Sequence, residues 1–103
     1  MVNLKANPYF LAEEDIKWVE ETIAGMNDEE KVGQLFFQLT QSKEEEYVKD
    51  LLGKYHLGGC RYNPGRPDDI QSQNRAIQKY SKIPAFIACN TEQGGDGACP
   101  GGT

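Results

Sequence analysis

Residues 57–89, LGGCRYNPGRPDDIQSQNRAIQKYSKIPAFIAC, decide the fold. The short apolar segment at 57–62 is followed by Asn-Pro-Gly and predicts a strand. Residues 68–80 then carry apolar side chains at helical spacing, and residues 83–89 predict a buried strand, in which Pro84 is tolerable only near the start. A strand, a helix and a strand in this order predict a βαβ unit with parallel strands.

The same alternation continues toward the N-terminus. Residues 35–39, LFFQL, predict a short buried strand, and residues 43–55 predict a helix with an apolar face. Further upstream, residues 13–25 predict an amphipathic helix, and Asn27 with Glu30 predicts the capping box of a short second helix. Two helices followed by three strands with two connecting helices predict an α/β fold with a parallel sheet.

We interpret residues 1–103 as one domain with four parts. They are an irregular lead-in (1–10), N-terminal helices (11–33), three strands with two crossover helices (34–89) and a Gly-rich loop (90–103). Right-handed crossovers place both connecting helices on one face of the sheet. The other face then lacks cover, although parallel sheets are normally buried on both sides. The chain is therefore expected to be an incomplete part of a larger fold, with marginal stability.

The composition argues against several classes of function. A chain of 103 residues and 11.5 kDa allows one domain. Its 16 acidic and 11 basic side chains give a net charge of −5, which disfavours nucleic acid as a partner. No apolar run could span a membrane, and the N-terminus has no secretory signal pattern. Three cysteines without an export signal predict reduced thiols in a cytoplasmic protein.

Three stretches resemble, in the right order and spacing, the N-terminal barrel domain of glycoside hydrolase family 3. MNDEEKVGQLF (26–36) resembles the helix-to-first-strand signature, with Asn-Asp in place of the usual Thr-Leu. LGGCRY (57–62) resembles the Gly-Gly second strand, and IPAFIACNTEQGG (83–95) resembles the third strand with its Asp-x-Glu-Gly-Gly loop. The resemblance covers about residues 11–95.

The resemblance implies about three βα units of a TIM (β/α)8 barrel and a role in β-glycoside cleavage. Enzymes of this family are retaining, exo-acting β-glycosidases whose Asp nucleophile and general acid/base lie well beyond the first hundred residues. The chain is therefore expected to have no catalytic residue, no cofactor and no metal, and to be an inactive N-terminal fragment of such an enzyme. A β-N-acetylhexosaminidase-like parent is the leading interpretation, and a β-glucosidase-like parent is the second.

Asn90, Glu92 and Arg61 are the candidate substrate-binding residues. The resemblance places Asn90 where the family has an Asp that bonds sugar hydroxyls, and Gln93 is inserted before the Gly-Gly pair. An Asn can donate to and accept from a hydroxyl but lacks the charge-assisted bond of an Asp. Asn90 and Glu92 could instead cap a turn. Arg61 could point into a barrel mouth or form an intramolecular ion pair.

Other polar residues give weaker signals. His56, Cys60, Cys89 and Cys99 lack the close ligand spacing of a zinc site, and strand cysteines are ordinary core residues. Asp96 is expected to be solvated. We reject Glu92 with Asp96 as a self-contained acid/base pair, because the Gly-Gly between them fixes no separation. The glycines at 94–97 lack the Lys-Ser/Thr and the helix of a phosphate loop.

Two further interpretations come from other classes. The chain could be a non-catalytic binding module that associates with itself or with a separate chain through its exposed sheet edge. It could also be a complete small flavodoxin-like protein, but three strands are too few for that fold and no cofactor fingerprint is visible.

Overall fold

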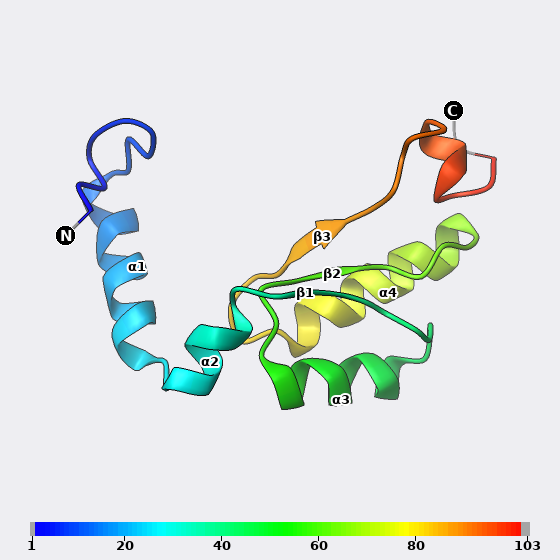
Figure 1. Cartoon of the computed structure of the whole chain (residues 1–103), viewed down its shortest axis with the longest axis horizontal. Helices are drawn as coiled ribbons and strands as arrows, with labels where there is room; N and C mark the ends of the chain where they lie inside the picture. Colours follow the sequence, from blue (N-terminus) through cyan, green and yellow to red (C-terminus); the bar gives the residue numbers. More distant parts are fainter. Residues whose placement is uncertain (1, 102–103) are drawn as a thin grey trace.

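The computed structural model of the chain describes residues 2–101, so Met1 of the predicted lead-in and residues 102–103 of the predicted Gly-rich loop lie outside the described residues. Figure 1 shows helices and strands in alternation. In chain order they are α1 (Glu13–Gly25), α2 (Asp28–Gly33), β1 (Phe37–Leu39), α3 (Glu45–Tyr55), β2 (Gly59–Arg61), α4 (Pro67–Tyr80), β3 (Phe86–Ala88) and the 3-10 turn η1 (Gly95–Gly97). The predicted helices and their order are confirmed, and each strand is shorter than its apolar run.

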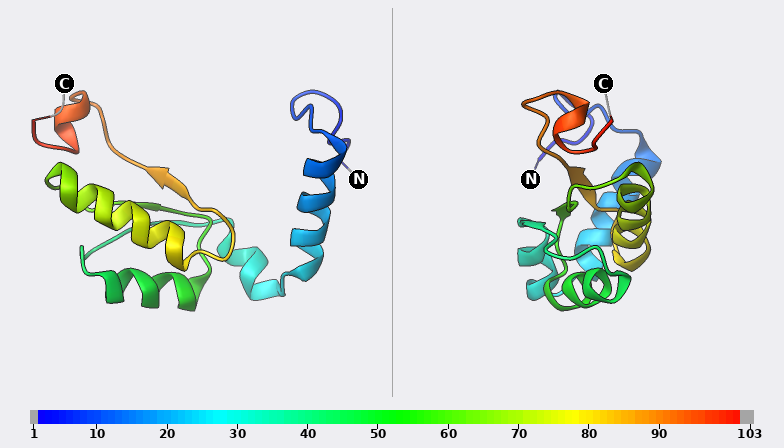
Figure 2. Two further views of the ribbon diagram at one scale, coloured as in Figure 1. Left: turned by 180° about the vertical axis from the view of Figure 1, so that it is seen from behind. Right: turned by 90° about the vertical axis from the view of Figure 1, so that its right-hand side faces the viewer.

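The three strands form one parallel sheet in the order β1-β2-β3. Helices α3 and α4 pack against each other and lie on the same side of this sheet (Figure 2). The predicted α/β class with parallel strands is confirmed. The register forms three rows: Phe37, Gly59 and Phe86; Gln38, Cys60 and Ile87; Leu39, Arg61 and Ala88.

The core lies between the sheet and the two helices. Cys60, in the middle of the central strand, is fully buried, and this burial raises the pKa of its thiol to about 11. The core consists of small and branched apolar side chains: Val48, Leu52, Leu57, Cys60, Ala76, Ile77 and Ala85. Cys60 is thus a core residue, as its strand position predicted. The same prediction is wrong for Cys89, because this residue follows the end of β3 and is exposed.

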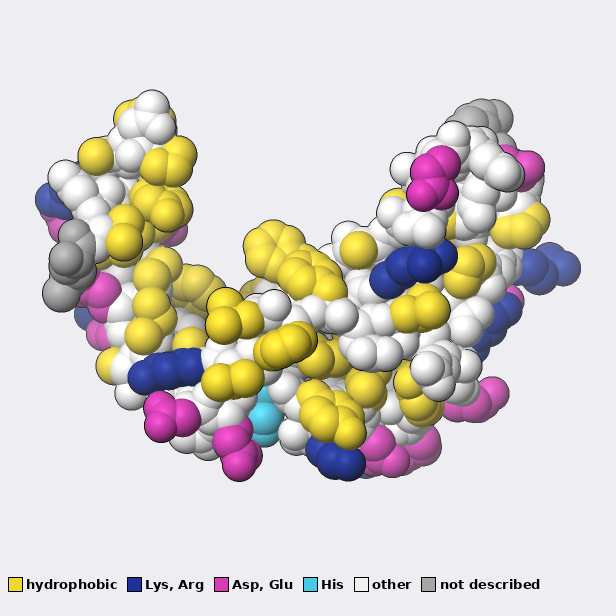
Figure 3. Space-filling view, viewed as in Figure 1, with side chains coloured by type: hydrophobic (Ala, Val, Ile, Leu, Met, Phe, Trp, Pro, Cys, Tyr) yellow, Lys and Arg dark blue, Asp and Glu magenta, His cyan; other side chains and the backbone are white. Residues whose placement is uncertain are grey.

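The opposite face of the sheet is open. Because side chains alternate along a strand, Phe37 and Phe86 project on the side away from Cys60 and the core. Their rings stack with centroids 6.0 Å apart across Gly59, and they are 54% and 72% exposed. Figure 3 shows hydrophobic side chains gathered over this part of the surface. The prediction of an uncovered face is confirmed. The predictions that residues 35–39 and 83–89 form buried strands are wrong, because both helices cover the other face and leave β1 and β3 largely exposed.

Helix α1 stands away from the sheet (Figure 1), and none of its side chains is buried. Helix α2 is better anchored. Its predicted capping box is present: Asn27 Oδ1 accepts from the Glu30 amide and Glu30 Oε2 accepts from the Asn27 amide, both at 2.9 Å. Lys82 donates to Glu30 Oε1 at 2.9 Å, and these bonds lower the pKa of the Glu30 carboxyl. The ion pair joins α2 to the segment that precedes β3.

Among residues 2–101, no helix combines the length and the apolar character needed to cross a membrane.

Candidate carbohydrate-binding edge

The three strands end at one edge of the sheet, where Leu39, Arg61 and Ala88 lie side by side. In parallel α/β proteins, the loops that follow the carboxyl ends of strands carry the binding and catalytic groups. The segments that leave this edge begin with Thr40, Tyr62 and Cys89. All three candidate substrate-binding residues belong to this edge or to the loop that leaves it.

Arg61 is the last residue of β2 and is partly buried. It lies two residues after Gly59, so its side chain projects on the open face of the sheet, away from the core. Within residues 2–101 its guanidinium forms no ion pair, so the alternative of an intramolecular ion pair has no support in this part of the chain. An Arg in this position presents a fork of N–H donors to whatever binds at the carboxyl edge.

Asn90 and Glu92 lie in the exposed loop between β3 and η1. The turn in this loop is made by the backbone, since the Gly94 amide donates to the Thr91 carbonyl at 2.9 Å and Gly94 adopts a φ of +78°. In the described part of the chain, neither the Asn90 nor the Glu92 side chain takes part in a hydrogen bond. The amide and the carboxylate are therefore free to meet a ligand, and no hydrogen bond joins them to Arg61.

Asp96 has a local structural partner. Its Oδ1 atom accepts a hydrogen bond from the Gly101 amide at 2.6 Å, and the residue is exposed, as predicted. The bond folds the end of the loop back on η1.

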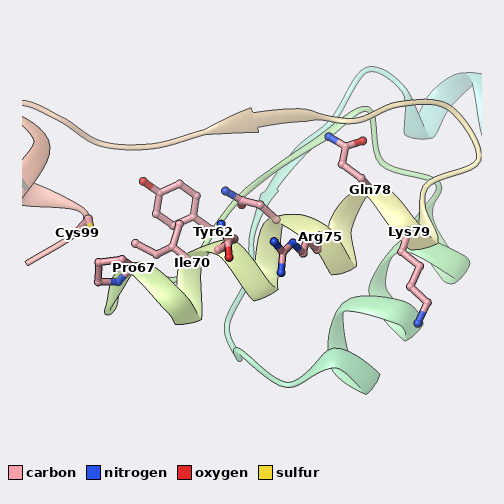
Figure 4. Close-up of a pocket in the computed structure, with 9 residues that line it drawn as sticks. Tyr62, Pro67, Ile70, Arg75, Gln78, Lys79 and Cys99 are labelled. Atoms are coloured by element: carbon pink, nitrogen blue, oxygen red, sulfur yellow. The ribbon is translucent and has the colours of Figure 1, made fainter.

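A groove of about 840 Å³ runs along α4 beside this loop. Tyr62, Pro67 and Ile70 gather at the N-terminal end of the helix, and Cys99 approaches from the loop (Figure 4). Burial, together with the neighbouring thiol of Cys89, raises the pKa of the Tyr62 hydroxyl. Asn74, which also lines this groove, has a buried Oδ1 atom without a hydrogen-bond partner among the described residues.

No group of three or more metal-ligating side chains occurs within residues 2–101. His56 ends α3 in a left-handed conformation, and its carbonyl accepts from the Gln34 side chain at 3.0 Å. Cys60 is enclosed in the core, whereas Cys89 is exposed. The structure does not assemble these residues into one site.

The sequence analysis missed a buried polar network at this edge. Thr40 and Gln73 are 0% and 1% exposed, and they join the ends of β1 and β2 to α4 through hydrogen bonds that also include Asn63. One signal was available in the sequence. Gln73 lies three residues after Ile70 and four before Ile77, so it occupies the buried stripe of the helix, where a polar side chain requires partners.

No protein-family model matches the chain. A β-N-acetylglucosaminidase/β-glucosidase from Cellulomonas fimi is 33% identical over 94 residues, which are 91% of this chain and 17% of that protein. Two solved structures of the β-glucoside phosphorylase BglX, one of them bound to 2FGlc, are 35% and 36% identical, with TM-scores of 0.73 and 0.76. These alignments cover 89% of this chain and 15% or 16% of those chains.

The chain thus spans about a sixth of the length of the relatives it matches. The match extends over nearly all of the described fold. It includes β2, which contains part of the Gly-Gly motif, and β3, which the Asn-x-Glu motif follows. Its parallel three-stranded sheet is consistent with part of a barrel. Over about nine-tenths of its length the chain is similar to enzymes of the glycoside hydrolase family 3 type, as its three sequence motifs indicated.

Proposed function

We propose that this chain supplies part of the sugar-binding edge of a retaining β-glycosidase that acts on β-N-acetylhexosaminides. The observation that carries the proposal is the place of the Asn90–Glu92 loop. The loop leaves the third strand at the carboxyl edge of the sheet, and the proteins that this chain resembles are named for activity on β-linked sugars. β-Glucosides are the second substrate class, because the names of these relatives include both sugars.

The chemistry of the edge suits a neutral sugar. The Asn90 amide can donate to one hydroxyl and accept from another, and the Arg61 guanidinium can only donate. The Glu92 carboxylate accepts from hydroxyls through charge-assisted bonds, which are roughly twice as strong as neutral ones. Together these groups can orient a polar ring without a metal or a cofactor.

The cleavage itself requires groups that this edge does not supply. Retention of configuration needs a nucleophile and an acid/base about 5 Å apart. The Asp96 carboxylate already accepts a hydrogen bond from the Gly101 amide, and Glu92 lies in an exposed loop where its side chain forms no hydrogen bond within residues 2–101. We therefore expect the 103-residue chain to bind sugar weakly and to release no p-nitrophenol from p-nitrophenyl β-N-acetylglucosaminide or β-glucoside, with water or with phosphate as acceptor.

The proposal is tested in a chimera in which this chain replaces the matched 94 residues of the Cellulomonas fimi relative. We expect the chimera to cleave both chromogenic substrates. Asn90→Ala and Arg61→Ala should each lower kcat/KM by about tenfold, since one hydrogen bond to a sugar hydroxyl contributes about 1.4 kcal/mol.

Gln93→Ala is the matched control, because it truncates a polar side chain in the same exposed loop at the position inserted relative to the family pattern. Its kcat/KM should stay within twofold of the chimera. A folded, active chimera that is indifferent to Asn90→Ala and to Arg61→Ala would refute the proposed sugar contacts. Turnover by the 103-residue chain alone would refute its inactivity.

A second candidate function is a non-catalytic module that associates with itself. The free edge of β1 favours it, because an apolar groove of about 960 Å³ lies there between α2 and α3. Its apolar lining comes mainly from Val32, Phe36, Phe37, Tyr47, Leu51, Tyr55 and Leu57. Unpaired strand edges beside apolar surface promote association. Size-exclusion chromatography with light scattering should then show a dimer or a larger species. A monomer of 11.5 kDa that persists when the protein concentration is varied over about 100-fold would argue against association.

A further inference from the structure

The side-chain amide of Gln73 holds the backbone that leaves the central strand. Its Nε2 atom donates to the Asn63 carbonyl at 2.9 Å, and its Oε1 atom accepts from the Asn63 amide at 2.8 Å. Gln73 is only 1% exposed. Both bonds are therefore shielded from competing water, and they fix one residue of the β2 exit from both sides.

Thr40 connects Gln73 to the backbone of Arg61 through hydrogen bonds. The Thr40 amide donates to the Arg61 carbonyl at 2.9 Å, and the Thr40 hydroxyl lies 3.3 Å from both that carbonyl and Gln73 Oε1. Asn63 Nδ2 in turn donates to the Thr40 carbonyl at 3.2 Å. The backbone is thus fixed at Arg61 and again at Asn63, with only Tyr62 between them.

A guanidinium at the end of a long side chain contributes to binding only when its base is held in the correct place. We propose that Gln73 is a positioning residue, which sets the place of the Arg61 side chain at the sugar-binding edge by clamping Asn63 and Thr40. The inference rests on the proposed contact between Arg61 and sugar. Gln73 itself lies inside the fold and touches no ligand.

The same helix provides a matched control. Gln78 clamps Ala85 in the same way: its Nε2 atom donates to the Ala85 carbonyl at 2.8 Å, and its Oε1 atom accepts from the Ala85 amide at 3.0 Å. Ala85 precedes β3, so this clamp lies at the amino edge of the sheet, opposite the candidate site. Gln73→Met removes the two bonds to Asn63 and the bond from the Thr40 hydroxyl, whereas Gln78→Met removes only the two equivalent bonds to Ala85. Both substitutions leave a side chain of similar length.

The experiment follows the Arg61 side chain and sugar binding separately in the 103-residue chain. The Arg61 Nε–H signal is recorded by ¹⁵N NMR in each variant. Methyl N-acetyl-β-D-glucosaminide and methyl β-D-glucoside are then titrated as probes. We expect Gln73→Met to shift or broaden the Arg61 signal and to raise the Kd of the bound probe by about tenfold. Gln78→Met should leave the signal in place and change the Kd by less than about twofold.

Thr40→Val provides a second test if Gln73→Met fails to fold, because it keeps the backbone bond to Arg61 and removes only the hydroxyl. It should move the Arg61 signal in the same direction, and Thr40→Ser should restore it. An Arg61 signal that is unchanged in Gln73→Met or Thr40→Val, or that moves equally in Gln78→Met, overturns the positioning role. If the unmodified chain binds neither probe, the sugar contact fails, and the Arg61 signal alone decides the positioning role.

Discussion

Gly58→Ala is expected to lower the free energy of unfolding by about 3 kcal/mol, near the upper end of what overpacking usually costs. A β-carbon at this position would lie 2.1 Å from the Gln34 carbonyl oxygen. The obstacle is backbone, so no side-chain rotation can relieve the clash. The approach is close because the Gly58 amide donates to the Gly33 carbonyl at 3.1 Å, which anchors the end of α2 beside the central strand.

Gly53→Ala is the matched control for this prediction. Gly53 lies in α3, and a β-carbon there would meet nothing within 4 Å. The substitution should raise the free energy of unfolding by about 0.5–1 kcal/mol, because alanine restricts the unfolded chain and favours the helix. Urea denaturation followed by circular dichroism measures both variants. A Gly58→Ala chain as stable as the unmodified one would mean that α2 does not approach the sheet so closely.

Ile77→Ala is expected to cost about 2–5 kcal/mol, the range for large-to-small substitutions in a packed core. Ile77 is 0% exposed and is one of the largest buried side chains. It projects from α4 into the core that α3 and the central strand complete. Residues 2–101 form a single hydrophobic core, on the helix side of the sheet, so the stability lost with Ile77 has no other core to offset it. Domains of this size are stable by only about 5–15 kcal/mol in total.

Ile23→Ala makes the same chemical change on a helix without a buried side chain. Ile23 is 50% exposed on α1, and its truncation should change stability by less than about 0.5 kcal/mol. Thermal and urea unfolding of both variants separate core packing from helix propensity, because the two substitutions improve propensity equally. Equal losses of stability in the two variants would contradict the assignment of the core to the α3–α4 face.

The order of the elements was readable from the sequence because its signals are local. The apolar spacing of 68–80 and the capping box of Asn27 and Glu30 depend on neighbouring residues alone, and the structure has both. Burial was less predictable. Phe37 and Phe86 belong to runs with the composition of buried strands, but they are 54% and 72% exposed, because burial depends on which face of the sheet the helices cover. That is a property of the whole sheet.

The candidate site was predictable only in part, for a related reason. The loop with Asn90 and Glu92 is contiguous, so a motif can indicate it. The clamp on the central strand joins Thr40, Asn63 and Gln73, which are separated by up to 33 residues. Nothing in the local sequence pairs them. Only the polar residue on the buried stripe of α4 gave a sign that such a network exists.

The strands occupy the sheet in the order in which they occur in the chain, each beside its predecessor. During synthesis at about 5–20 residues per second, β1 can therefore pair with β2 before β3 leaves the ribosome, because parallel pairing and helix packing need far less than a second. The core can form strand by strand. Phe37 remains solvated throughout this interval, and Phe86 joins it on the same open face once β3 has paired, so we expect the nascent chain to present exposed aromatic side chains to chaperones.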